Sequence, residues 1–137
     1  RASAEEVMSG RGLHNIYTAL AQDAGKEATF AEPAQITEAA LAGTCDISAA
    51  TLTQFCRIMG SFAGNLALNM ATTGGIFIGG GIANRFPEFI QNSDFRARFE
   101  AKGQMKHYVK DIPTYLIAEP DHGLLGAAAY LQQHTAS

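Results

Sequence analysis

Charged residues are scarce in this 137-residue chain: they make up 17% of it, and the formal net charge is −3. The ten lysines and arginines form no basic run, which argues against a nucleic-acid-binding surface. The two cysteines, Cys45 and Cys56, have neither a zinc spacing nor the numbers of a disulfide framework, and they favour a reducing cytosol. With 47% hydrophobic residues, the chain does not belong to the disordered class.

Signals for export or membrane insertion are also absent, because the sequence has neither a signal peptide nor a transmembrane run. Internal repeats and low-complexity segments are missing too. The length is typical of one domain, so residues 1–137 are expected to form one compact unit. The chain begins Arg1-Ala2-Ser3 without an initiator Met, which suggests a piece of a larger protein.

Helical periodicity dominates the first half. Apolar spacing predicts helices over residues 11–23 and over 33–43, the latter with Pro33 at its first position. A long, buried helix is expected from Asp46 or Ser48 to about residue 71. It carries small residues at Gly60, Gly64 and two later alanines. Because each glycine costs a helix about 1 kcal/mol, we expect another backbone to approach closely there.

The second half predicts an α/β arrangement. Residues 76–78 form an apolar run that suits a buried strand, and residues 113–118 suit a second one. Short helices are expected near 87–91, 93–101 and 104–110, and a closing helix over 124–133. Two strand–turn–helix units imply parallel strands with helices on the faces. The predicted sheet is therefore very small, and the chain rich in helix.

A glycine run, Gly79-Gly80-Gly81, follows the first predicted strand and precedes a helix. Backbone without side chains can lie against a base or ribose, so this segment is a candidate nucleotide site. A tight turn that only packs the helix onto the sheet explains it equally well. The dinucleotide fingerprint is not met, since its last position is Asn84, and the Walker pattern is absent.

Glu5 is the other candidate. Ser3 and Glu6 have the spacing of a capping box, which leaves Glu5 free to accept hydrogen bonds from a ligand's hydroxyl groups. Taken alone, a solvated first-turn carboxylate that complements the helix dipole explains it better. The four histidines show no metal-ligand spacing, and both cysteines suit helix packing rather than nucleophilic catalysis. The basic residues of 96–110 are expected on a solvated face.

The ordered motifs of the whole chain resemble those of bacterial-type glucokinases, which have the hexokinase/actin-like ATPase (ribonuclease H-like) fold. The resemblance rests on five stretches of sequence, which read SAEEVMSGRGL (residues 3–13), FCRIMG (55–60), GNLALN (64–69), GGIFIGGGI (74–82) and DIPTYLI (111–117). Arg85-Phe86 and Gly123-Leu124-Leu125-Gly126 complete it. The chain as a whole then corresponds to the C-terminal lobe of such an enzyme.

That resemblance implies specific roles. Glu5 matches the family glutamate that hydrogen-bonds the sugar hydroxyls. Gly80 and Gly81 match the glycine pair that lies against adenosine, whereas Gly79 stands where relatives can carry Ala. Glucose, ATP and Mg²⁺ are the implied ligands, and a cytoplasmic homodimer is the implied assembly, with neither nucleic acid nor membrane as partner.

The same comparison leaves the catalytic parts outside the chain. The general-base Asp, both phosphate-binding loops and a second sugar segment of the family have no counterpart here, so we expect no catalytic residue, no metal ligand and no activity from this chain alone. Two alternatives remain: a kinase of another hexose with the same fold, or a non-catalytic nucleotide-binding or self-association module. The cysteine-rich zinc motif of the related repressor/kinase group is absent.

Overall fold

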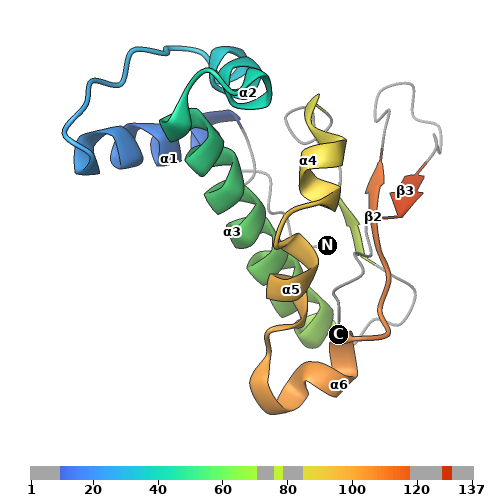
Figure 1. The fold of residues 1–137 in the computed structure, drawn as a ribbon. Coiled ribbons are helices and arrows are strands. Elements are labelled where there is room, and N and C mark those ends of the chain that lie inside the picture. Colours follow the sequence, from blue (N-terminus) through green and yellow to red (C-terminus); the bar gives the residue numbers. More distant parts are fainter. Residues whose placement is uncertain (1–9, 71–75, 79–84, 118–127, 131–137) are drawn as a thin grey trace.

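The computed structural model describes residues 10–70, 76–78, 85–117 and 128–130. Three helices come first: α1 (Gly10–Asp23), α2 (Pro33–Ala42) and α3 (Asp46–Met70). Strand β1 (Ile76–Ile78) is followed by α4 (Pro87–Gln91), α5 (Phe95–Glu100), the 3₁₀ turn η2 (Gly103–Met105) and α6 (Lys106–Val109). Strands β2 (Thr114–Ile117) and β3 (Ala128–Tyr130) end the order. Figure 1 shows α3 through the middle, with α1 and α2 at one end of it and the strands beyond α4 and α5.

The first three helices confirm the predicted periodicity closely. Leu13, Tyr17 and Ala21 of α1 are buried at helical spacing. Helix α2 has Pro33 in its first turn and ends at Gly43, whose φ of 74° suits glycine. The loop between these helices is fixed by two side chains of α1. Tyr17 Oη accepts the backbone N–H of Thr29 at 3.1 Å, and His14 Nε2 lies 3.0 Å from the carbonyl oxygen of Phe30.

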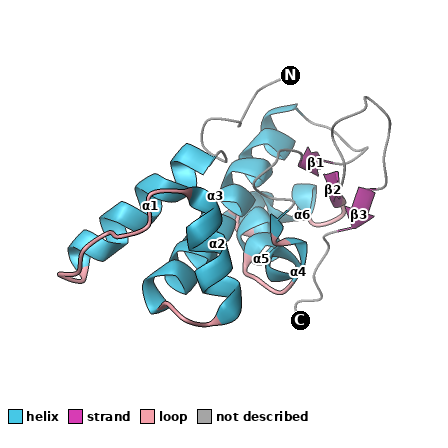
Figure 2. Cartoon of the chain, turned by 90° about the horizontal axis from the view of Figure 1, so that it is seen from above, coloured by secondary structure: helices cyan, strands magenta, loops and turns pink. Residues whose placement is uncertain are grey.

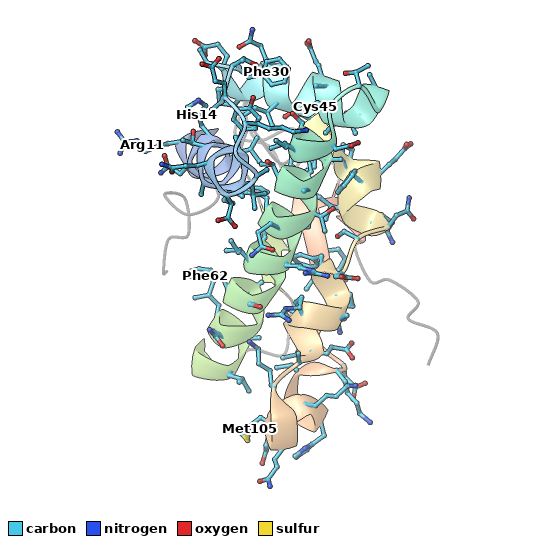
Figure 3. All side chains as sticks on the ribbon, turned by 60° about the vertical axis from the view of Figure 1, so that its left-hand side comes forward. Arg11, His14, Phe30, Cys45, Phe62 and Met105 are labelled. Atoms are coloured by element: carbon cyan, nitrogen blue, oxygen red, sulfur yellow. The ribbon has the colours of Figure 1, made fainter. Side chains whose placement is uncertain are left out.

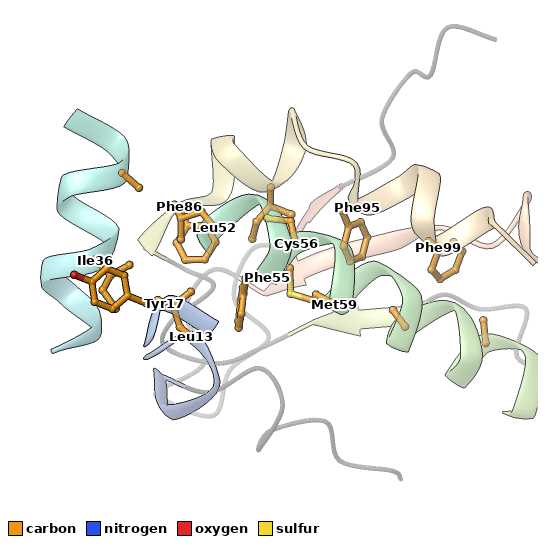
Figure 4. Close-up of a cluster of buried hydrophobic side chains, with 14 of the residues drawn as sticks. Leu13, Tyr17, Ile36, Leu52, Phe55, Cys56, Met59, Phe86, Phe95 and Phe99 are labelled. Carbon is orange, nitrogen blue, oxygen red and sulfur yellow. The ribbon is translucent and has the colours of Figure 1, made fainter. Parts of the chain in front are cut away.

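The core lies along α3, which contributes Leu52, Phe55, Cys56 and Met59 to it. Figure 4 shows these side chains between α1 and α2 on one side and the phenylalanines of the α4–α5 region on the other. Phe86, Phe95 and Phe99 are each at most 2% exposed. Burying such a side chain contributes about 1.5–3 kcal/mol, so one buried helix organises the described part of the chain, as its apolar pattern predicts.

The glycines of α3 mark its contact with α5, the most extensive contact between two helices of the structure. A Cβ atom added at Gly60 would lie closer than 3.0 Å to the carbonyl oxygen of Phe95, and one at Gly64 equally close to that of Phe99. The two backbones can approach this closely only because no side chain separates them. The expected close approach is therefore confirmed, and the neighbour is α5.

The described strands form one sheet in the order β1-β2-β3. β1 and β2 are parallel, as predicted, with Ile76 paired to Thr114 and Ile78 to Leu116. Figure 2 shows the sheet on one side of the helical layer. The described residues thus confirm a helix-rich α/β chain with a small sheet. Helices α4, α5 and α6 lie within the ranges predicted for them.

The closing helix predicted over 124–133 is wrong at residues 128–130, which form β3 antiparallel to β2. Small residues such as Ala128 and Ala129 favour a helix by propensity. In the folded chain they pair with β2, whose outer N–H and C=O groups would otherwise lack backbone partners. Pairing with a strand that is distant in sequence therefore outweighs the local helix propensity of these residues. The remainder of that predicted helix, and the capping box predicted at Ser3 and Glu6, lie outside the described residues.

Candidate functional site

All predicted ligand-binding residues, Glu5, Gly79, Gly80 and Gly81, lie outside the residues that the structure describes. What the structure does describe is the frame on either side of the glycine run. Strand β1 ends directly before Gly79, and α4 begins at Pro87 after Phe86. The candidate nucleotide segment is therefore bounded by a strand on one side and a helix on the other, as the sequence predicts.

The strand side of this frame is set by the pairing of β1 with β2. Because the two strands are parallel, their carboxyl ends, at Ile78 and at Ile117, lie at the same edge of the sheet. Open α/β sheets bind ligands outside the carboxyl ends of their strands. The chain therefore leaves β1 for the glycine run at the edge that is suited to a ligand.

The helix side is fixed by an aromatic anchor. Phe86, which is 2% exposed, packs edge-on against Phe55 of α3 with 6.0 Å between ring centroids, and lies 6.4 Å from Phe89 of α4. Arg85 immediately before it is exposed. The first buried residue in the described range that follows the candidate segment is thus held by the central helix, directly before the start of α4.

The start of strand β2 is held in place by Arg96, whose guanidinium is completely buried. Its Nε donates to Glu100 at 2.8 Å, and its Nη atoms donate to the carbonyl oxygens of Ile112 at 2.7 Å and Lys110 at 2.8 Å. Thr114, the first residue of β2, receives a longer bond at 3.5 Å. The guanidinium also lies 4.4 Å from the centre of the Phe99 ring. Arg96 therefore connects α5 to the chain that enters the sheet.

This corrects the prediction that Arg96 lies on a solvated face. A buried arginine is tolerable because every edge of its planar fork meets an acceptor and its flat face meets an aromatic ring. The only sequence signal was its position beside the inward-facing Phe95, with Glu100 four residues later. The other basic residues of 96–110 confirm the prediction: Arg98, Lys106 and Lys110 are exposed, and Lys102 is partly so.

The described residues offer no alternative catalytic centre. His14 is used structurally and His107 is exposed beside Tyr108, while His122 and His134 lie outside the described residues. Within the described ranges, no group of three or more His, Cys, Asp or Glu side chains could hold a metal ion.

Two shallow grooves occur among the described residues. One, of about 330 Å³, lies along α3 and α5 beside Ser61 and Arg98, and the other, of about 390 Å³, lies beside Leu41 and Phe89. Neither groove is lined by a residue that the sequence singles out as a ligand. No helix in the described part of the chain has the length and apolar character to cross a membrane.

Comparison with known proteins gives one consistent family. The family model described as Glucokinase matches residues 1–134. The glucokinase of Colwellia psychrerythraea is 52% identical to this chain over 97% of it, and that of Citrobacter koseri is 52% identical over 96%. The Escherichia coli K12 glucokinase has the same identity and coverage as the latter.

A solved structure shares the fold as well. The crystal structure of a glucokinase from an Antarctic psychrotroph matches 87% of this chain with a TM-score of 0.78 and 41% sequence identity. The chain covers 37% of that structure, and about two fifths of the length of the curated relatives, 42% and 41% for the first two. The similarity therefore extends over nearly all of this chain but over less than half of each relative.

Proposed function

The chain belongs to the glucokinase family, and we propose that the intact protein transfers the γ-phosphoryl group of ATP to the 6-hydroxyl of glucose, at the entry to glycolysis. The observation that carries this proposal is the family match over residues 1–134. This chain would be the C-terminal lobe of the enzyme, which would provide one sugar contact and the adenosine side of the nucleotide site.

Glu5 is the proposed sugar contact. An ionised carboxylate accepts hydrogen bonds through two oxygens, and bonds to a charged acceptor are the stronger kind. It can therefore hold two neighbouring hydroxyl groups of a pyranose. Such contacts bind and orient the sugar without taking part in proton transfer, so the loss of Glu5 should act mainly on glucose affinity.

The glycine run is the proposed adenosine contact. Strand β1, which pairs in parallel with β2, ends directly before it in the sequence, and the buried Phe86 follows it. A flat base or ribose can lie directly on backbone that has no Cβ, chiefly at Gly80 and Gly81. Arg96 supports this side indirectly, because its hydrogen bonds fix the segment that enters β2.

The chemical step needs groups that this chain does not supply. Phosphoryl transfer depends on positioning and on cations that neutralise developing charge, and a general base must take the proton of the sugar hydroxyl. Mg²⁺ bound with ATP would supply the charge neutralisation. We assign the general base to the part of the protein outside this chain.

The test is a coupled assay of glucose-dependent ADP formation by the intact protein, with other hexoses and an amino sugar in parallel. Glucose should give the highest kcat/KM. A clear preference for another hexose would identify a different kinase of the same fold. Complete absence of sugar-dependent ATP consumption would instead favour the non-catalytic module.

Matched variants test the assigned residues. Glu5→Gln should raise the KM for glucose by about tenfold or more, as expected when a charge-assisted hydrogen bond worth about 1.5–3 kcal/mol is weakened, with the KM for ATP unchanged. Glu6→Gln, one residue away and assigned to the helix cap, should leave both unchanged. Gly80→Ala should raise the KM for ATP and leave that for glucose. A Glu5→Gln enzyme with wild-type glucose KM would exclude the sugar role.

We also propose that the intact protein is a cytoplasmic homodimer, like the bacterial enzymes that its sequence resembles. Sedimentation equilibrium of the intact protein distinguishes a dimer from a monomer directly. A monomer at all micromolar concentrations would rule out this assembly without affecting the proposed activity.

A further inference from the structure

Cys45 occupies a special position at the start of the longest helix. It is the residue directly before α3, which runs for 25 residues from Asp46. Its sulfur accepts the backbone N–H of Ser48 at 3.4 Å, so the thiol takes the place of a capping hydroxyl. The side chain is partly exposed and is labelled near Phe30 at one end of the molecule in Figure 3. It therefore does not fit the predicted packing role.

The second cysteine provides an internal contrast. Cys56 lies about three turns further along and is fully buried in the core, as predicted, with 0% exposure. Burial raises the pKa of the Cys56 thiol to about 12. At pH 8 about one molecule in 10⁴ would then carry a Cys56 thiolate. The two thiols thus differ in exposure, and their surroundings shift their pKa values in opposite directions.

A buried hydroxyl group lies beside the exposed thiol. Ser48 has 0% exposure, and its Oγ has no hydrogen-bond partner of good geometry; it is the only buried side-chain polar atom among the described residues of which this is true. A buried hydroxyl without a partner is destabilising, because it has lost its hydrogen bonds to water. The Cys45 sulfur already accepts the backbone N–H of Ser48, and the Ser48 O–H can donate to the same sulfur once it is negative.

The charges around Cys45 act in the same direction. The nearby Ser48 hydroxyl, which can donate to the thiolate, is the chief cause that lowers the pKa of Cys45, and the backbone N–H groups of Ser48 and Ile47 add to it. Slight burial and the neighbouring Asp46 carboxylate oppose this effect without cancelling it. A thiolate at a helix N-terminus also faces the positive end of the helix dipole.

We propose that Cys45 is a modification site at which low-molecular-weight disulfides form a reversible mixed disulfide with the protein. Its thiolate attacks one sulfur of the disulfide, a new sulfur–sulfur bond forms, and the old one breaks. The second half leaves as a thiolate and takes a proton from water. The Cys45 sulfur is oxidised as the leaving thiol is reduced, and a later thiol reverses the reaction. This site is independent of the proposed phosphoryl transfer.

Oxidised glutathione is the probe for this site. The intact, folded protein is incubated with it at pH 8, quenched with acid and digested with endoproteinase Asp-N. Cleavage before Asp46 places Cys45 on peptide 23–45 and Cys56 on peptide 46–93. Mass spectrometry should find glutathione on the first peptide and none on the second, and dithiothreitol should remove it.

The Ser48 hydroxyl has its own test. Below the pKa of a thiol, a lower pKa speeds exchange, because the thiolate fraction rises faster than its nucleophilicity falls. Ser48→Ala should therefore slow the modification of Cys45 several-fold, while Ser61→Ala, in the same helix but distant from Cys45, should not. In 6 M urea all three proteins should react at equal rates. An unmodified Cys45 in the native protein, or a rate that Ser48→Ala leaves unchanged, would overturn the proposal.

Discussion

Replacing Gly60 by Ala separates two opposite expectations about the central helix. By propensity alone, an alanine in the middle of α3 should stabilise the protein by about 1 kcal/mol. In the structure, the added Cβ atom would lie less than 3.0 Å from the carbonyl oxygen of Phe95, and within 3.1 Å of two further backbone atoms of that residue. The packing of α5 therefore predicts that the substitution destabilises the protein.

The size of the effect follows from what must move. A flexible side chain could turn away at little cost, but the atoms that crowd Gly60 belong to the backbone of α5. Overpacking a well-packed site costs about 1–3 kcal/mol, and a rigid neighbour places this case at the upper end. With about 1 kcal/mol of helix propensity recovered, we expect a net loss of about 2 kcal/mol in the free energy of unfolding.

Urea unfolding of the intact protein, followed by far-UV circular dichroism, measures this loss as a lower midpoint at constant slope. Ala50→Gly is the matched control, because Ala50 is an exposed residue of the same helix and should lose about 1 kcal/mol through propensity alone. A Gly60→Ala protein that equals or exceeds the wild type in stability would refute the close packing of α3 on α5.

Two further substitutions test the buried groups. Arg96→Met should lower the free energy of unfolding by about 3–5 kcal/mol, because it leaves the Glu100 carboxylate and several carbonyl groups without their partner. Arg96→Lys keeps the charge but not the planar guanidinium, so its stability should lie between those of the wild type and Arg96→Met. Above about pH 9 the unfolded chain loses the Cys56 proton, which the folded chain retains up to about pH 12 because burial raises the pKa of this thiol. The free energy of unfolding should therefore fall by up to about 1.4 kcal/mol per pH unit in this range. Cys56→Ala should reduce that slope. Urea titrations at fixed pH values measure both.

The sequence predicts most of the helical layer because local signals and tertiary packing agree there. The apolar stripe of α3 is its buried face, Pro33 and Gly43 bound α2, and the glycines at positions 60 and 64 mark a real contact between helices. Each of these features can be predicted from the sequence, because the same residue type suits both the local backbone conformation and the contact with the neighbouring element. For the glycines, the sequence indicates a contact but not the identity of the partner.

The wrong predictions concern residues whose structure depends on contacts that local sequence patterns do not show. Arg96 looks like a surface residue because its acceptors, apart from Glu100, lie at the entrance of β2, more than ten residues further along the sequence. Residues 128–130 look helical because the pairing with β2 that makes them a strand lies more than ten residues away. Cys45 looks like a packing residue because only the position of the helix start shows that it is the cap. The candidate ligand contacts at Glu5 and Gly79–Gly81 stay predictions.

Helix α5 couples two of these features, and a double-mutant cycle measures the coupling. Gly60 admits the backbone of α5 at Phe95, and the next residue, Arg96, connects the same helix to the entrance of β2. If the Gly60→Ala substitution displaces α5, the guanidinium can no longer meet its carbonyl acceptors at 2.7–2.8 Å. The Gly60→Ala protein has then already lost part of the stability that Arg96→Met removes. The double variant should therefore be less destabilised than the sum of the single variants, by more than the roughly 0.3–0.5 kcal/mol within which independent sites add. Strict additivity would mean that α5 absorbs the added methyl group without moving, and that the glycine contact and the buried arginine stabilise the chain separately.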